Sequence, residues 1–317
     1  MNESIERTSP VWNHWGTVIS DAGMTSADAL REAELDWRVE LQPIYQQHDY
    51  VEPYVARTPI DGYKATVRSS DRNVLGIVKD RYRVLQNVDA FRFGDDVLDA
   101  SGAHWVTAGA KSSGSTVWMT ARLPEQLLVG GSRDEALDQY FVFTNSHDGS
   151  GSVTFMVTPV RAWCQNTLAL AMRSASRLHK IKHTQSMNGR LIEARKALDI
   201  SFAYTEALVE DMTGLLNEKF GWLEYVDLVE ELFPIGEDSS KRGRTVAEKN
   251  RDTLHDIWNH TPDLQNIRGT KYGALQSVIE FNDWHTKGRC VNTEENKFSR
   301  VLLQNNITHR AYDLLKA

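Results

Sequence analysis

The segment from Phe143 to Thr167 holds most of the side chains in this chain that could do chemistry. Its candidate residues are His147, Asp148, Arg161, Cys164, Asn166 and Thr167. An imidazole beside a carboxylate can transfer protons, a cysteine can act as a nucleophile, and an arginine can bind an anion. The residue types and their spacing therefore predict a site in this segment, and three kinds of chemistry fit it.

The first chemistry is nucleophilic catalysis by a cysteine. Such a site would use Cys164 as nucleophile, His147 or His183 as base, and Asn166 or Asp148 as the group that orients the base. A helix start and a neighbouring arginine both lower a thiol pKa, and Cys164 lies three residues after Arg161 at the start of an expected helix. The competing interpretation is that Cys164 is a small buried hydrophobe on the apolar side of that helix.

The second chemistry is metal binding, for which the candidate ligands are His147, Asp148, His179 and His183. His179 and His183 are four residues apart, so they would share one face if the helix continued that far. No glutamate accompanies them in the zincin spacing, and no cysteine pair completes a tetrahedral set. We therefore expect no metal and no cofactor.

The third chemistry is nucleic-acid binding, which the local charge favours. From Arg161 to Leu198 the basic residues are Arg161, Arg173, Arg177, Lys180, Lys182, Arg190, Arg195 and Lys196, and the only acid is Glu193. Lys and Arg neutralise phosphates, so the first five of these residues are the expected backbone contacts, with His147 and Asn166 adding hydrogen bonds. From Glu206 to Asp238 the balance reverses, because ten acids face only Lys219.

Aromatic side chains allow a further contact with single strands. Trp105, Trp118 and Trp163 would stack on bases if they were exposed, and they would be core residues if they were not. The motif residues also have purely structural interpretations. Gly149 fits a turn that needs positive φ, Asn166 and Thr167 fit helix caps, and Arg161 fits an ion pair with Asp148.

The elements that must position these residues can be predicted from periodicity. At 100° per residue, Cys164, Leu168, Ala171, Met172, Ala175 and Leu178 share an apolar arc, and Arg173, Arg177 and Lys180 lie opposite as a basic stripe. Upstream, alternating or β-rich runs predict strands over 62–68, 74–78, 103–110, 115–123, 138–145 and 152–160. Thr25 is the expected N-cap of a short helix, and 88–100 is the expected second helix.

This order predicts an α+β fold in which an antiparallel β-meander with packed helices is followed by a mostly helical region. We expect helix breaks at Gly221, at Pro234–Gly236 and at Thr261-Pro262, and a linker between Pro53 and Pro59. The expected organisation is an N-terminal aromatic segment and helix over 1–50, an α+β core over 51–200, and a helical region over 201–317.

The composition is that of an ordinary globular protein, with 317 residues, 41% hydrophobic and 25% charged. No apolar run reaches the length of a membrane span, and the first residues are polar, so we expect a cytoplasmic location without membrane contact. The net charge of −7 excludes a protein that coats nucleic acid with its whole surface, so any anion site must be local.

Several motifs resemble a known family. They are Tyr82–Asn87, Asn145–Ser150, Arg161 with Cys164 and Asn166–Leu168, His183-Thr184 and Gly269–Ala274. On these the chain resembles the phage/plasmid-like proteins of domain of unknown function 932. The resemblance implies a mobile-element protein that acts inside a bacterial host cell.

The expected order of strands and helices is also similar to the cores of single-strand annealing proteins, which commonly form rings. That analogy implies single-stranded DNA as the partner, a role in DNA recombination, and a homo-oligomer. The alternative is a cytosolic enzyme that acts on a small molecule or nucleotide through Cys164 and His147.

Overall fold

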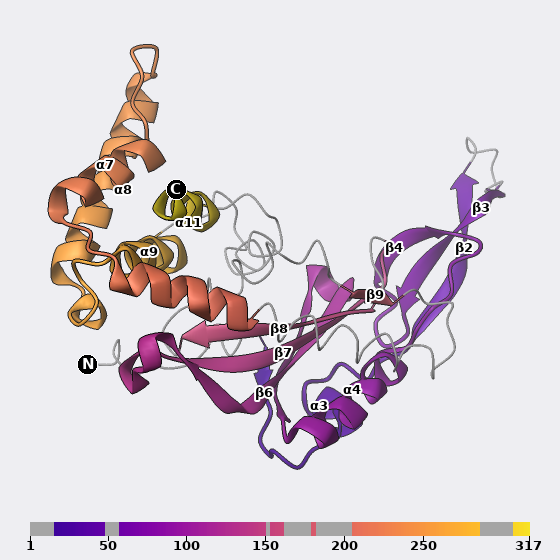
Figure 1. Cartoon of the computed structure of the whole chain (residues 1–317). Coiled ribbons are helices and arrows are strands. Elements are labelled where there is room, and N and C mark those ends of the chain that lie inside the picture. The colour runs from indigo at the N-terminus through magenta and orange to yellow at the C-terminus, as the bar shows by residue number, and fades with distance from the viewer. Residues whose placement is uncertain (1–15, 48–56, 150–152, 162–178, 182–204, 286–306) are drawn as a thin grey trace, which may run out of the picture.

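A computed structural model describes residues 16–47, 57–149, 153–161, 179–181, 205–285 and 307–317 (Figure 1). It confirms the predicted α+β fold class, because antiparallel sheets in the N-terminal part precede a mostly helical C-terminal region. None of the helices in the described part of the chain is long and apolar enough to cross a bilayer.

The larger sheet has six strands in the order β1-β5-β6-β7-β8-β9, and every neighbouring pair is antiparallel. The strands are β1 (Thr17–Val18), β5 (His104–Lys111), β6 (Thr116–Leu128), β7 (Ala136–Ser146), β8 (Val153–Arg161) and β9 (His179–Ile181). The predicted strands over 103–110, 115–123, 138–145 and 152–160 correspond to β5 to β8. The predicted antiparallel meander is therefore confirmed.

Two helices pack against this sheet and form its core. Thr25 caps α3 (Ser26–Glu32) as predicted, and its side chain accepts a hydrogen bond from the Asp28 N–H. The second helix, α4 (Asn87–Ser101), ends at Gly102 in the left-handed conformation. Trp105 and Trp118 are both buried, so their interpretation as core residues is confirmed and the alternative of stacking platforms does not apply to them. Burying these large apolar rings stabilises the fold more than leaving them exposed to water would.

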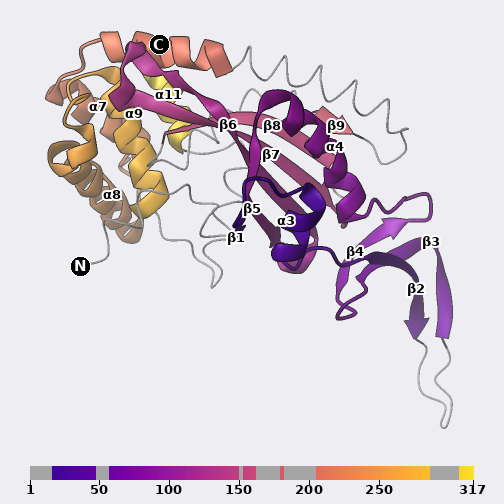
Figure 2. The same ribbon diagram turned by 90° about the horizontal axis from the view of Figure 1, so that it is seen from below.

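The smaller sheet has three antiparallel strands, β2 (Val39–Gln47), β3 (Arg57–Arg68) and β4 (Val74–Lys79), in the order β2-β3-β4. We call these three strands the arm. Figures 1 and 2 show the arm at one end of the six-stranded sheet, with the helical region near the other end. The predicted linker is wrong from Arg57 to Pro59, because these residues already belong to β3, where Pro59 pairs with Tyr45 next to a register shift.

The helical region has a second core of its own. It contains helical residues 205–217, α7 (Trp222–Leu232), α8 (Lys241–His260), α9 (Lys271–Glu280) and α11 (Ile307–Lys316). The predicted breaks are confirmed, since Gly221 precedes α7, Pro234–Gly236 lies between α7 and α8, and Thr261 ends α8. Leu137 of β7 and Val129, which directly follows β6, join this core.

Candidate functional site

His147 follows β7 and lies where the two sheets meet. Its side chain has no exposed surface. The Nε2 atom is 2.8 Å from the Asn87 Oδ1 atom, and the ring lies 5.5 Å from that of Trp37, centre to centre. Because an amide oxygen can only accept, this contact assigns the Nε2 proton to the imidazole. His147 therefore serves as a buried hydrogen-bond donor.

Asn87 and Asn145 complete a polar cluster around this histidine. Asn145 Nδ2 donates to the Leu85 carbonyl at 3.0 Å and to Asn87 Oδ1 at 3.1 Å. Asn87 Nδ2 donates to the Leu35 carbonyl at 2.9 Å. Both asparagines are buried, and buried amides need such partners because an unmade hydrogen bond there costs free energy. The cluster therefore ties the start of α4 to the end of β7.

The structure thus brings together two motifs that lie about sixty residues apart in the chain. Besides Asn87, the segment Tyr82–Asn87 contributes Tyr82, whose hydroxyl donates to the Ser146 carbonyl at 3.1 Å. Burial raises the pKa of Tyr82 to about 12, and the nearby charge of Asp148 adds to this rise. The phenol therefore stays protonated at physiological pH. The burial of this phenol and its hydrogen bond to Ser146 indicate a structural role for Tyr82.

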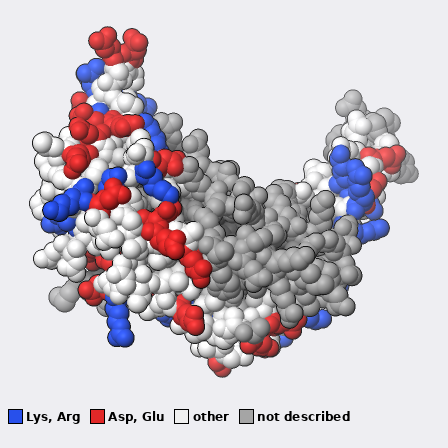
Figure 3. All heavy atoms as spheres, viewed as in Figure 1, with Lys and Arg blue, Asp and Glu red and all other residues white. Residues whose placement is uncertain are grey.

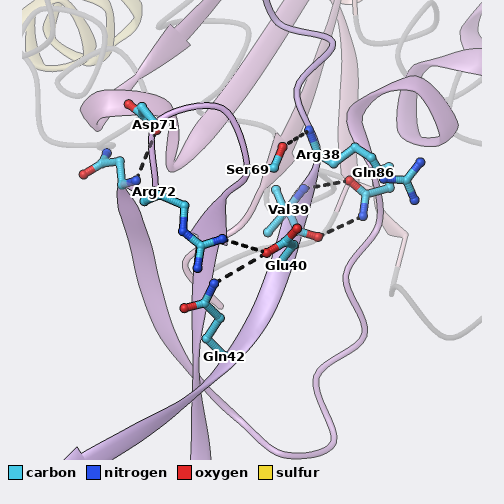
Figure 4. A network of polar contacts seen from close by, with 9 residues as sticks. Arg38, Val39, Glu40, Gln42, Ser69, Asp71, Arg72 and Gln86 are labelled. Atoms are coloured by element: carbon cyan, nitrogen blue, oxygen red, sulfur yellow. Dashed lines mark hydrogen bonds and ion pairs between the residues drawn. The ribbon is translucent and has the colours of Figure 1, made fainter.

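The same junction holds the arm in place. The Thr66 hydroxyl of β3 donates to the His147 carbonyl at 2.8 Å. In Figure 4, the Gln86 side chain meets the backbone of Val39 at the edge of β2. Its Oε1 accepts from the Val39 N–H at 2.9 Å and its Nε2 donates to the Val39 carbonyl at 3.0 Å, so this amide pairs with β2 as a peptide group of a further strand would.

The turn after His147 is close to the arm as well. Gly149 has a φ of +80°, which confirms the predicted need for a glycine there. A Cβ atom built on Gly76 of β4 would collide with the Asp148 backbone, so the backbones of these two segments are in direct contact. The Asp148 carboxylate accepts from the Ser146 hydroxyl at 2.7 Å.

Arg161 lies at the opposite end of the sheet from His147. It pairs with Leu137 at the start of β7, whereas His147 follows the end of that strand. Ten residues of extended chain span about 33 Å, so the backbone positions of Arg161 and Asp148 are too far apart for an ion pair. The predicted ion pair is wrong, because the length of two paired strands separates residues that looked crowded in the sequence.

His179 and Lys180 lie on strand β9, where they pair with Phe155 and Thr154 at the start of β8. The prediction that they continue a helix is therefore wrong, because pairing with the sheet edge replaces the helical periodicity. As strand residues, Lys180 cannot extend a helical basic stripe and His179 cannot share a helix face with another histidine. No cluster of three or more metal-ligating side chains occurs among the described residues.

Other predictions concern residues outside those that the structure describes. These are the proposed roles of Cys164, Asn166, Thr167, Arg173, Arg177, Lys182 and His183, together with Trp163. They stay predictions.

The fold and the junction define an α+β protein in which a buried polar cluster joins two antiparallel sheets. The chain belongs to the family named domain of unknown function DUF932, which it matches over residues 74–303. A comparison with curated proteins and with solved structures finds no match.

Sequence reasoning did not find the roles of Gln86, Asn87 and Asn145. All three stood in motifs that carry the family resemblance, but nothing in the sequence showed that those motifs meet. The sequence did contain one indication of these roles: the three amide side chains lie beside apolar runs, and a buried amide requires a specific hydrogen-bond partner.

Proposed function

We propose that this protein binds nucleic acid, with single-stranded DNA favoured, and that it acts in phage or plasmid DNA metabolism in the cytoplasm of a bacterial host. One observation carries the proposal: eight basic residues between Arg161 and Leu198 face a single acid in a protein of net charge −7. The like charges in this segment repel one another, and a polyanion that binds there removes this repulsion. Annealing of complementary strands is the expected activity.

The phosphate contacts in this proposal come from Arg161, Arg173, Arg177, Lys180 and Lys182. Lys180 pairs at the start of β8 and Arg161 ends that strand. Thr154 and Arg161 are seven positions apart in the strand, so Lys180 and Arg161 lie about 23 Å apart along β8. His147 is left out of these contacts because it is buried.

The alternative enzyme would pair Cys164 with His147. The imidazole of His147 is fully buried and donates to Asn87, so no described contact favours its use as a base. A homo-oligomer is the expected state, and the acidic segment from Glu206 to Asp238 is charge-complementary to the basic segment of a second copy.

The test is fluorescence anisotropy of labelled single- and double-stranded oligonucleotides at two salt concentrations. We expect salt-sensitive binding with preference for the single strand, because each phosphate contact releases counterions. The double variant Arg173→Glu with Arg177→Glu should weaken binding at least tenfold. Strand-annealing assays on the wild-type chain would follow.

A matched control reverses two exposed charges elsewhere, Arg92→Glu with Arg133→Glu, and keeps the net charge change equal. Equal losses in both variants would mean that only net charge matters, and absence of binding at low salt would overturn the proposal. Cys164→Ala should leave binding unchanged, whereas an enzyme would lose its turnover.

A further inference from the structure

The arm exposes an unusual share of apolar side chains. Ten large hydrophobic residues of the described chain are exposed, and five of them lie on the arm, although it is a small part of the molecule. They are Tyr45, Ile60, Tyr63, Val74 and Ile77. Clustering of this kind marks a contact surface more often than scattered exposure does.

The strand register places two of these residues, Tyr63 and Ile77, on one face. Residues directly opposite in an antiparallel pair point to the same side, and so do residues two apart in one strand. Tyr63 lies opposite Lys79 and Ala65 opposite Ile77, whereas Val74 follows a register shift between Thr66 and Val67 and pairs with the buried Val67. Tyr63 and Ile77 are 46% and 61% exposed. We call this the outward face of the arm.

The arm is also basic within an acidic protein. The three strands together with the residues that adjoin them, 36–47 and 57–83, include eight basic side chains against five acidic ones. The basic residues are Arg38, Arg57, Lys64, Arg68, Arg72, Lys79, Arg81 and Arg83, and the acidic residues are Asp36, Glu40, Asp61, Asp71 and Asp80. Figure 3 shows Lys and Arg side chains gathered on the arm, with Asp and Glu beside them.

Two of the five acids are held in ion pairs. Arg72 Nη1 lies 3.1 Å from Glu40 Oε2, and Arg68 Nε donates to Asp71 Oδ1 at 2.8 Å. Glu40 shares the outward face, since it pairs with Val67 across β2 and β3. Its neutralisation by Arg72, drawn in Figure 4, lowers the repulsion that an approaching phosphate would meet.

We propose that the outward face of the arm is a platform for single-stranded nucleic acid. A base stacks on the ring of Tyr63, Lys79 opposite it contacts the adjoining phosphate, and Ile77 packs against the next base. This inference rests on the proposed function, to which it adds a second contact region and the feature that selects single strands. A duplex keeps its base faces stacked and cannot use Tyr63.

A second copy of the chain is the rival occupant of this face. In a two-fold interface the same patch meets itself, so the surplus of basic groups on one arm would face the same surplus on the other. A polyanion has the opposite charge. The observations therefore favour nucleic acid.

The test compares Tyr63→Ala and Tyr63→Phe by anisotropy with single-stranded and duplex oligonucleotides. Tyr63→Ala should weaken single-strand binding about tenfold without changing its salt slope, and Tyr63→Phe should stay within about twofold of wild type. Duplex binding should be the same in all three proteins. Lys79→Ala should lower the single-strand salt slope by about 0.7.

Trp222→Ala, which removes an exposed aromatic ring from the helical region, is the matched control and should bind like wild type. If wild type binds but Tyr63→Ala and Ile77→Ser bind equally well, the inference is overturned while the proposed function stands. If wild type binds no oligonucleotide, the proposed function itself fails. Loss of a dimer in Tyr63→Ala by light scattering, with unchanged DNA binding, would assign the face to a second copy.

Discussion

Strands β7 and β3 are similar in length and differ sharply in their surroundings. In β7 all but the first residue are buried, whereas in β3 the first seven residues are exposed and only Thr66 and Val67 are buried. A strand that is covered on both faces holds a fold together. One that is exposed along most of its length must be fixed from one end, and it leaves its side chains available for contact.

The two sheets are accordingly stabilised by different interactions. The six-stranded sheet packs aromatic rings, with Phe143 5.2 Å from Trp105 and 5.9 Å from Phe155 between ring centres. The arm is anchored by hydrogen bonds at its root, from Gln86 to Val39 and from Thr66 to the His147 carbonyl. Substitutions in the two regions should therefore affect the stability of the protein in different ways.

The largest effect should come from Phe143→Ala, which removes a fully buried ring from the sheet core. We expect a loss of about 4 kcal/mol in the free energy of unfolding, measured by urea denaturation. The matched substitution on the arm, Tyr63→Ala, should change it by less than about 0.5 kcal/mol because the ring is half exposed. Equal losses would mean that the outward face is part of a core.

Asn87→Ala should cost about 3 kcal/mol, because it leaves Asn145, His147 and the Leu35 carbonyl with unmade hydrogen bonds in a buried place. The exposed Asn259, whose amide donates to the His255 carbonyl, gives the control, since Asn259→Ala should cost less than about 0.5 kcal/mol. A small loss for Asn87→Ala would show that the junction tolerates missing partners.

Gln86→Ala tests whether the arm is fixed from its root. Its expected cost is about 1 kcal/mol, but it should act locally. By hydrogen exchange, the Val39 amide should lose protection because its acceptor is gone, while the Val142 amide in β7 should keep its own. Unchanged protection at Val39 would mean that pairing with β3 alone holds the edge of β2.

The smallest effect concerns Asp71 in the turn between β3 and β4. Hydrogen bonds from Arg68 and from the Asn73 N–H lower the pKa of this carboxyl to about 2. Because the folded pKa is depressed, the stabilisation is complete above the ordinary value near 3.8 and is lost as pH falls toward 2. An NMR titration should show the midpoint rising in Arg68→Gln. An unchanged midpoint would assign the shift to the backbone contact.

The sequence predicted local elements well, because their signals are local. Alternation defined β4, β5 and β6, the Thr25 cap defined α3, and Gly and Pro marked the helix breaks. It missed β2, where Pro43 interrupts a run with little alternation. It also placed Lys180 on a helix, since the pairing of β9 with β8 depends on a partner that no single-segment pattern contains.

The candidate site was harder to predict, for a geometric reason. His147 and Arg161 are close in sequence but stand at opposite ends of two paired strands. Gln86 and Asn87 are distant in sequence from Asn145 and His147, yet Asn87 bonds directly to both and Gln86 anchors β2 beside them. Composition indicated a basic segment. It could not show which motif residues a folded chain would bury.

The close approach of Gly76 to Asp148 has a consequence for how this protein can diversify. Backbone meets backbone there, so the direction of the arm relative to the larger sheet is set without any side chain of the outward face. Residues such as Tyr63, Ile77 and Lys79 can be exchanged while the arm keeps its orientation. Related chains could thus acquire different binding preferences on an unchanged frame, as long as position 76 stays a glycine.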